Sequence, residues 1–195
     1  FSIKLLSALP VITANSVTID GSKQTTNVGD TNTLGPEIEI DGSGAGSAAA
    51  GIDVNSNNCD INSVAIDNFA SGAGIFINGT TNTVTGCYLG VTAAGVSGVS
   101  NRYGIVADGN GNNIGGTTAG HGNLISGTTV NGIDIRNTST GGSILGNLIG
   151  TDRLGKTAIG NGADGIIIQS ATFGVIVGGS SAGSGRRLTA AASIT

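Results

Sequence analysis

The stretch that decides the fold runs from Gly132 to Asp152 and reads Gly-Ile-Asp-Ile-Arg-Asn-Thr-Ser-Thr-Gly-Gly-Ser-Ile-Leu-Gly-Asn-Leu-Ile-Gly-Thr-Asp. It holds three short apolar marks, at Ile133/Ile135, at Ile144 and at Ile149. Ile133 and Ile135 alternate with polar residues, which places them on one face of a strand. The segments between the marks are rich in Gly, Asn, Ser and Thr, which favour turns.

The same unit recurs along the chain. The pair Gly-Ile stands at Gly51-Ile52, Gly74-Ile75, Gly104-Ile105, Gly132-Ile133 and Gly165-Ile166. The differences between these positions are 23, 30, 28 and 33 residues, which is the spacing of solenoid repeats. A second apolar mark follows each pair at Ile61, Val84, Ile114, Ile144 and Ile176 or Val177, and a third at Ile66, Leu89, Ile125 and Ile149. Each repeat is therefore predicted to hold two or three short strands.

A parallel β-helix satisfies this pattern, because one repeat cannot bury its isoleucines alone. Stacked coils, roughly 4.8 Å apart, place equivalent aliphatic residues in interior columns. Two earlier segments, Val17-Thr-Ile-Asp20 and Ile38-Glu-Ile-Asp41, read as further strands that end in an Asp-Gly turn. We predict one all-β domain over residues 1–195 with roughly six or seven coils. It divides into N-terminal coils (1–50), regular repeats (51–180) and an irregular tail (181–195).

The composition excludes the other classes. Of 195 residues 36 are Gly, none is Trp or Met, and charged residues make up 10%. Coiled coils, helix bundles and collagen need other compositions. The formal net charge is −4 and the basic residues are scattered, which gives no nucleic-acid footprint. The most apolar stretch, 165–179, is interrupted by polar residues, so no membrane insertion is expected.

Two features of the chain leave alternatives open. Cys59 and Cys87 are too few for a disulfide framework, and they are compatible with one bridge or with two buried thiols. The chain starts at Phe1, and Phe1 to Leu6 alternates like a strand rather than a signal peptide. We therefore expect a processed chain or a fragment of a longer protein.

Several motifs resemble a known family. Asn123-Leu-Ile-Ser-Gly127, Gly146-Asn-Leu-Ile-Gly-Thr-Asp152, Asn113-Ile-Gly-Gly116 and Val17-Thr-Ile-Asp-Gly21 are similar to segments of right-handed parallel β-helix repeat proteins of the pectin-lyase-like superfamily. The resemblance covers about residues 3–180 and implies a right-handed helix in a secreted or surface protein of bacteria. In that family Gly-Asn commonly precedes the third strand, as at Gly146-Asn147. The matching pairs here are Ser63-Val64 and Gly86-Cys87, so we expect an interrupted asparagine ladder.

The resemblance requires an enzyme to be considered, because the superfamily includes polysaccharide lyases and hydrolases. Those activities need clustered carboxylates, or basic residues with calcium, on an outer strand face. The outward positions after the Gly-Ile pairs are Asp53, Phe76, Val106, Asp134 and Ile167. The two carboxylates are three coils apart, roughly 14 Å, which is too far for a glycosidase pair. We identify no catalytic residues, and we expect His121 to be an exposed loop residue.

Two segments of the sequence resemble calcium-binding loops. Asp108-Gly-Asn-Gly-Asn112 resembles half of an EF-hand loop, but Ala119 stands where a bidentate Glu is needed. Gly160-Asn-Gly-Ala-Asp-Gly-Ile166 resembles a single copy of a calcium-binding nonapeptide that works in tandem. We interpret both as polar turns and predict no cofactor, with calcium as the alternative.

Insertions point to the functional face. Extra residues fall at 90–103, 115–122 and 150–164, and insertions in a solenoid usually map to one face, often the binding face. We predict a structural or adhesive segment of an extracellular or cell-surface protein, whose loops contact glycans or surface proteins. Further copies of the chain are an additional expected partner, through end-to-end self-association. A polysaccharide-active or carbohydrate-binding β-helix is the alternative, for which Phe76, Tyr88, Tyr103 and Phe173 could offer aromatic platforms. The binding candidates are Asp53, Phe76, Asp134, Asp152 and Asp164.

Overall fold

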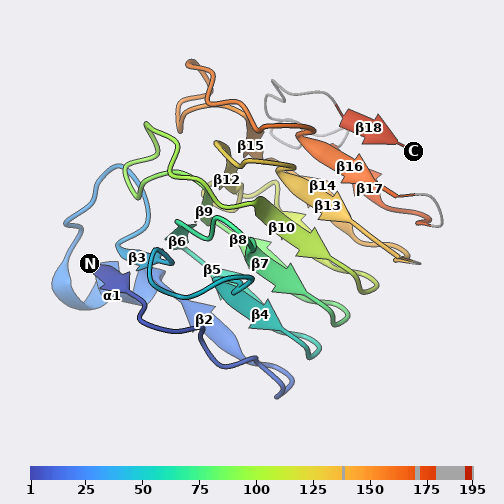
Figure 1. The fold of residues 1–195 in the computed structure, drawn as a ribbon, viewed down its shortest axis with the longest axis horizontal. Helices are drawn as coiled ribbons and strands as arrows, with labels where there is room; N and C mark the ends of the chain where they lie inside the picture. Colours follow the sequence, from blue (N-terminus) through green and yellow to red (C-terminus); the bar gives the residue numbers. More distant parts are fainter. Residues whose placement is uncertain (138, 170–171, 179–191, 195) are drawn as a thin grey trace.

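The computed structural model, which describes residues 1–137, 139–169, 172–178 and 192–194, consists of three parallel six-stranded sheets (Figure 1). Sheet A contains β1 (Ser2–Lys4), β3 (Ile38–Asp41), β6 (Val64–Asp67), β9 (Tyr88–Leu89), β12 (Leu124–Ile125) and β15 (Leu148–Ile149). Sheet B contains β4 (Ile52–Val54), β7 (Ala73–Ile77), β10 (Tyr103–Ala107), β13 (Ile133–Ile135), β16 (Ile166–Ile168) and β18 (Ala192–Ile194). Sheet C contains β2 (Thr18–Asp20), β5 (Asp60–Asn62), β8 (Thr83–Thr85), β11 (Asn113–Gly115), β14 (Ser143–Leu145) and β17 (Ile176–Val177).

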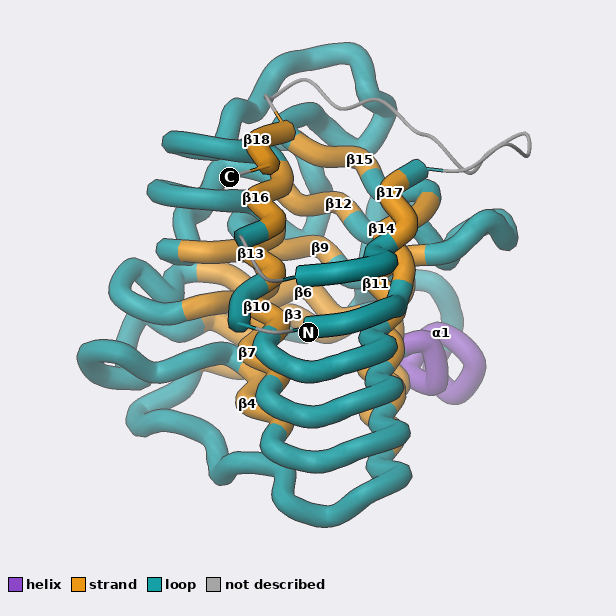
Figure 2. Tube along the Cα trace, turned by 90° about the vertical axis from the view of Figure 1, so that its right-hand side faces the viewer, coloured by secondary structure: helices purple, strands orange, loops and turns teal. Residues whose placement is uncertain are grey.

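The chain visits the three sheets in a fixed order. From residue 51 onward each coil passes through sheet B, then sheet C, then sheet A, and the next coil pairs with it in parallel. Figure 2 shows the turns between sheets stacked as successive rungs. This is the parallel β-helix that the repeat predicts, and six strands per sheet agree with the expected number of coils.

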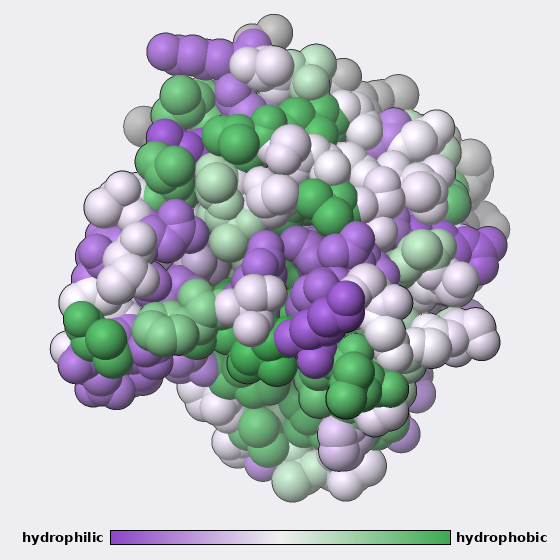
Figure 3. All heavy atoms as spheres, turned by 60° about the vertical axis from the view of Figure 1, so that its left-hand side comes forward, coloured by the Kyte–Doolittle hydropathy of each residue, from purple (hydrophilic) through white to green (hydrophobic). Residues whose placement is uncertain are grey.

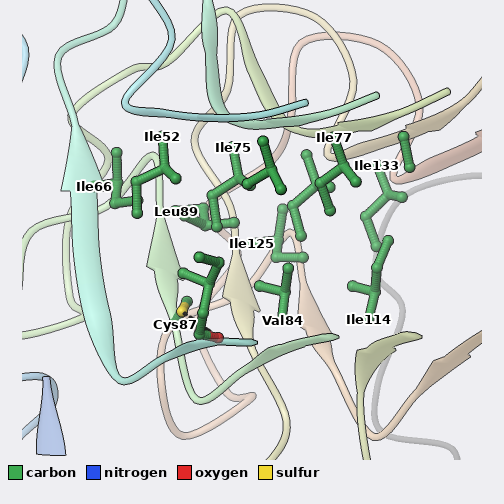
Figure 4. Packing of buried hydrophobic residues seen from close by; sticks show 14 of the residues in the cluster. Ile52, Ile66, Ile75, Ile77, Val84, Cys87, Leu89, Ile114, Ile125 and Ile133 are labelled. Atoms are coloured by element: carbon green, nitrogen blue, oxygen red, sulfur yellow. Dashed lines mark hydrogen bonds between the residues drawn. The ribbon is translucent and has the colours of Figure 1, made fainter. Parts of the chain in front are cut away.

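Aliphatic columns fill the interior. In sheet B the register aligns Ile52, Ile75, Ile105, Ile133 and Ile166. In sheet C it aligns Ile61 with Val84, Ile114 and Ile144. The inward residues of sheet A join these columns in one buried cluster (Figure 4). The predicted first, second and third apolar marks are therefore the inner faces of sheets B, C and A.

Packing requires a glycine in four of the Gly-Ile pairs, at Gly51, Gly74, Gly104 and Gly132. A Cβ at Gly104 would lie 2.4 Å from Ile125 Cγ2 and 2.5 Å from the carbonyl oxygen of Gly132. A Cβ at Gly51 would meet Ile66 Cγ2 at 2.3 Å in the same way. These glycines lie at the start of the sheet B strands, Gly51 just before β4 and Gly104 inside β10, where the chain contacts the next coil. The recurring Gly-Ile thus marks the entry into sheet B, where there is no space for a side chain.

Asparagines cap the corners between coils. Asn147 Oδ1 accepts the backbone N–H of Asn123 at 2.9 Å, and Asn123 Oδ1 accepts that of Cys87 at 2.9 Å. The ladder stops at Cys87, as the Gly86-Cys87 pair predicts. A second ladder, which sequence patterns did not indicate, joins Asn112 to Asn82 and Asn82 to the backbone N–H of Cys59. Both cysteines occupy ladder positions, and both are free, buried thiols.

Two parts of the chain depart from the regular coil. Helix α1 (Ser22–Val28), which was not predicted, lies outside the coil between β2 and β3 and buries none of its residues. Of the tail predicted to be irregular (181–195), Ala192–Ile194 forms β18 beside β16, and the rest lies outside the described residues. The described part of the chain has no helix with the length and hydropathy that a membrane span requires.

Candidate functional site

The outer face of sheet A is covered instead of open. Its outward residues alternate with the buried inner ones, and the register lines up Ala65, Tyr88, Leu124 and Leu148. Ala65 and Leu124 are at most 1% exposed although they point away from the core. Loops must therefore cover this face, which gives it the depth that a binding site needs.

Three loops stack over this face. The loop at 30–37 contacts the loop at 90–101, where Asn32 Nδ2 donates to the carbonyl oxygen of Ala93 at 3.0 Å. That loop contacts the one at 150–161, where the backbone N–H of Arg153 donates to the carbonyl oxygen of Gly95 at 2.9 Å. We call these three segments the loop column. Two of its members are the insertions predicted from the repeat spacing.

The last two members of the loop column have the same fold. Val91 bridges Gly98 and Thr151 bridges Ala158, both in antiparallel fashion. The backbone N–H of Val99 closes onto Gly90 O at 2.8 Å, and that of Ile159 onto Gly150 O at 2.9 Å. Because of these closing bonds, each loop is a short hairpin and not an extended loop.

A cavity of about 300 Å³ lies beside the loop column. Its floor includes Tyr88, Leu124 and Leu148, and Arg153 contributes from the loop column. The loop at 30–37 contributes Gly35, Pro36 and Glu37. The rest of the lining comes from the start of α1, from the insertion at 115–122 and from residues between strands, chiefly Ser22, Thr25, Thr117, Thr118, Gly120, Ser63, Gly86 and Gly146. In Figure 3 hydrophobic residues form separate green patches among hydrophilic ones instead of one continuous apolar surface. Hydroxyl groups, glycine backbone, one aromatic ring, two leucines and two charged side chains thus surround the cavity.

Two formal charges line the cavity, those of Glu37 and Arg153. Glu37 is already bound, because its carboxylate accepts hydrogen bonds from the hydroxyl and backbone N–H of Thr31 and from the backbone N–H of Asn32 at 2.7 Å. These bonds, that of the Thr31 hydroxyl above all, lower the pKa of Glu37. Arg153 forms no ion pair with any described residue, and its buried Nε has no hydrogen-bond partner there.

Tyr88 presents its ring to the cavity. Its hydroxyl donates to the carbonyl oxygen of Leu34 at 3.0 Å, which fixes the ring against the loop column. Burial raises the pKa of Tyr88, although the charge of Arg153 opposes the shift. The phenol is therefore neutral at physiological pH and offers an aromatic face.

A group of carboxyls lies under the loop at 90–101. Asp67 is 2% exposed and neighbours Asp41 in the register. Asn68 Nδ2 donates to Asp41 Oδ1 at 2.9 Å and to Asp67 Oδ1 at 3.1 Å. Burial, then the charges of Glu39 and Asp41, raise the pKa of Asp67 to about 7. Sequence reasoning missed this group, because Asp41 and Asp67 come together only through the register of sheet A.

The outer face of sheet B carries the predicted column. The register aligns Asp53, Phe76, Val106, Asp134 and Ile167. The two carboxylates are thus three coils apart, as the repeat alignment indicates, and they do not form a pair. Asp134 instead accepts bonds from Arg136 Nε at 2.9 Å and Nη2 at 2.8 Å, and from Gln169 Nε2 at 3.0 Å. The Arg136 guanidinium lies 4.9 Å from the centre of the Tyr103 ring.

The other candidates stay apart from this column. Asp152 Oδ1 accepts the backbone N–H groups of Leu154 and Lys156 and so holds its own hairpin in shape. Asp164 lies just before β16, where its backbone N–H donates to Asn131 Oδ1 at 3.1 Å. His121 is exposed in the loop at 116–123. The structure therefore places Asp53, Phe76 and Asp134 in one outer column of sheet B, with the two carboxylates three coils apart, and keeps Asp152 and Asp164 outside that column.

The first of the two segments considered for calcium, Asp108 to Asn112, serves coil stacking through its asparagines. Asn110 Oδ1 accepts the backbone N–H of Thr140 at 2.8 Å. Asn112 Nδ2 donates to Gly79 O and to Gly109 O. The described residues hold no cluster of three or more His, Cys, Asp or Glu that could bind a metal ion.

No protein-family model, curated protein or solved structure matches this chain. The function must therefore be inferred from the outer faces of sheets A and B. Of these, the face of sheet A contains the cavity.

Proposed function

We propose that this chain is a structural, adhesive β-solenoid segment of a secreted or cell-surface protein that binds glycans in the cavity over sheet A. The observation that carries the proposal is the cavity itself, about 300 Å³ in volume and built by loops from several different coils. Such a volume is within the range of ligand sites in proteins.

The lining fits a sugar better than an apolar ligand. Hydroxyls of Ser22, Thr25 and Thr118, and backbone groups of glycines such as Gly120, can bond to sugar hydroxyls. The Tyr88 ring supplies one apolar face for a sugar ring. A rigid rod with a preformed pocket on its side suits display and attachment, since ligand binding requires little reordering of the chain.

A catalytic role has less support. The sheet B column separates its two carboxylates by three coils, and Asp134 is occupied by Arg136 and Gln169. A glycosidase needs two free carboxyl groups within reach of one bond. We therefore propose binding, and keep polysaccharide cleavage as the alternative that a reducing-sugar assay would reveal.

A glycan array probed with the purified chain tests the proposal. Thr118→Trp should abolish the signal, because Thr118 lines the cavity and a large ring would fill it. Thr129→Trp is the matched control, since Thr129 is exposed in the loop at 126–132 and does not line the cavity. No binding by the wild type, or equal loss in both variants, would refute the proposal.

A further inference from the structure

We infer that the cavity selects a sugar bearing a carboxylate or a sulfate ester, and that Arg153 binds this acidic group. The inference deepens the proposed function and rests on it. The guanidinium of Arg153 lies at the cavity wall and has no acidic partner among the described residues.

The hairpin fixes Arg153 in place. Its backbone N–H donates to Gly95 O at 2.9 Å, and the neighbouring Asp152 carboxylate holds the turn through Leu154 and Lys156. The hairpin thus fixes the backbone of Arg153, and burial of its Nε restricts the side chain, so little conformational entropy is lost when it binds an anion. Its planar donors match the two oxygens of a carboxylate, or those of a sulfate ester.

The other charge of the cavity does not neutralise Arg153. Both oxygens of Glu37 accept bonds from Thr31 and Asn32 within their own loop, and no ion pair joins Glu37 to Arg153. The remaining lining is uncharged. A ligand that fits must therefore combine one anionic group with neutral hydroxyls, which describes a uronic acid or a sulfated sugar.

General attraction of polyanions would not explain such binding. The chain carries a net charge of −4, and a surface of that sign repels acidic polymers at long range. Any preference for acidic glycans must come from a local cation. Lys156, exposed in the same hairpin but outside the cavity lining, allows a charge-matched comparison.

The experiment compares acidic glycans with their neutral counterparts. Two probes are taken from the best acidic binders of the array, one glucuronate oligosaccharide and one sulfated oligosaccharide. Each is titrated calorimetrically against the wild-type chain, and so is its neutral counterpart, the carboxyl-reduced or the desulfated form. We expect the acidic form to bind about tenfold or more tightly. Arg153→Gln should remove this preference, whereas Lys156→Gln should retain it.

The outcomes separate the two proposals. Equal binding of acidic and neutral forms by the wild type, with Thr118→Trp still blocking both, would overturn the acidic selectivity and leave the glycan site standing. Equal losses in Arg153→Gln and Lys156→Gln would also overturn it. A wild type that binds no glycan refutes the proposed function and the inference together. The comparison of acidic and neutral ligands needs no variant, so it holds even if Arg153→Gln fails to fold.

Discussion

At the scale of single residues, the glycine of the Gly-Ile pair shows how coil packing dictates sequence. Gly104 carries no left-handed backbone angle, yet a Cβ there would overlap Ile125 and Gly132. Gly160 differs, since a Cβ would meet nothing within 4 Å. Packing thus requires glycine at position 104, whereas at position 160 there is space for a larger residue.

The two positions should respond oppositely to alanine. Gly104→Ala should lower the free energy of unfolding by about 2 kcal/mol or more, because the start of β10 must move away from Ile125 and from the next coil. Gly160→Ala should be neutral or stabilise by about 0.5 kcal/mol through the unfolded chain. Urea unfolding followed by circular dichroism measures both. Equal effects at the two sites would contradict the packing role of the Gly-Ile glycine.

The buried carboxyl of Asp67 should make stability depend on pH. Its pKa is raised from 3.8 to about 7, so the folded protein keeps a proton that the unfolded chain releases. This contribution to stability is complete below about pH 4 and is lost as the pH rises through about 7. Asp67→Asn removes this contribution. The free energy of unfolding of the variant, taken relative to that of the wild type, should therefore rise by about 2–4 kcal/mol as the pH goes from 4 to 8.

Urea unfolding of the wild type and Asp67→Asn at several pH values between 4 and 8 tests this expectation. Asp60→Asn is the control, because Asp60 is exposed on sheet C. Stability profiles of wild type and Asp67→Asn that run parallel would show that Asp67 does not hold its proton in the folded protein.

At the scale of the element, each corner ladder is a column in which a cysteine replaces an asparagine. Cys87 lies below Asn123, and its thiol has two carbonyl oxygens within reach, Thr85 O at 3.3 Å and Ile61 O at 3.7 Å. In the coil above, Asn123 Nδ2 donates to Val84 O at 2.9 Å, and Val84 is the register partner of Ile61. The thiol therefore occupies the position of the amide group, as a weaker donor that it shares between Ile61 O and Thr85 O.

Replacing Cys87 by its column residue should extend the ladder. Cys87→Asn should be at least as stable as the wild type, because the introduced amide would donate to Ile61 O. Cys87→Val matches the thiol in apolar character but has no donor, and should be less stable than Cys87→Asn by about 1–3 kcal/mol. Thermal unfolding of both variants measures the difference. A less stable Cys87→Asn would mean that this corner has no room for the amide.

The strands were predictable because each one repeats the same contacts. Ile133 and Ile135 alternate, and the aligned isoleucines of other coils confirm one inner face. Helix α1 was not predictable in this way, since it occurs once and buries no residue. The ladder of Asn82 and Asn112 was missed because the residues around it vary from coil to coil, and only the register brings the two together.

At the scale of the whole molecule, the cavity joins residues whose distances along the chain follow no period. The insertions indicated the face, and the structure places Thr118 and Arg153 beside one cavity. Their meeting depends on hairpin geometry and on the contact between the loops at 90–101 and 150–161. Repeat spacing predicts where loops leave the coil but not how they fold. The sequence could therefore predict which side of the β-helix carries the site, but not the residues that line it.

The end of the rod that carries β1 and β2 should mediate self-association. These strands lie at the edges of sheets A and C, and no described strand pairs with their outer sides. Apolar side chains are exposed in the same region, among them Ile3 at 51% and Leu6 at 90%. Unpaired strand edges template further strands, and a head-to-tail contact between copies does not close, so it yields filaments.

We expect the mass from light scattering to rise with protein concentration for the wild type and to rise less for Leu6→Lys. Leu154→Lys is the control, because Leu154 is 57% exposed on the side of the rod, in the hairpin at 150–161. The charge introduced at the end would have to be desolvated in the contact, whereas the charge on the side would remain in water. A wild type that stays monomeric at every concentration would exclude end-to-end assembly. Equal behaviour of the two lysine variants would place any contact elsewhere on the surface.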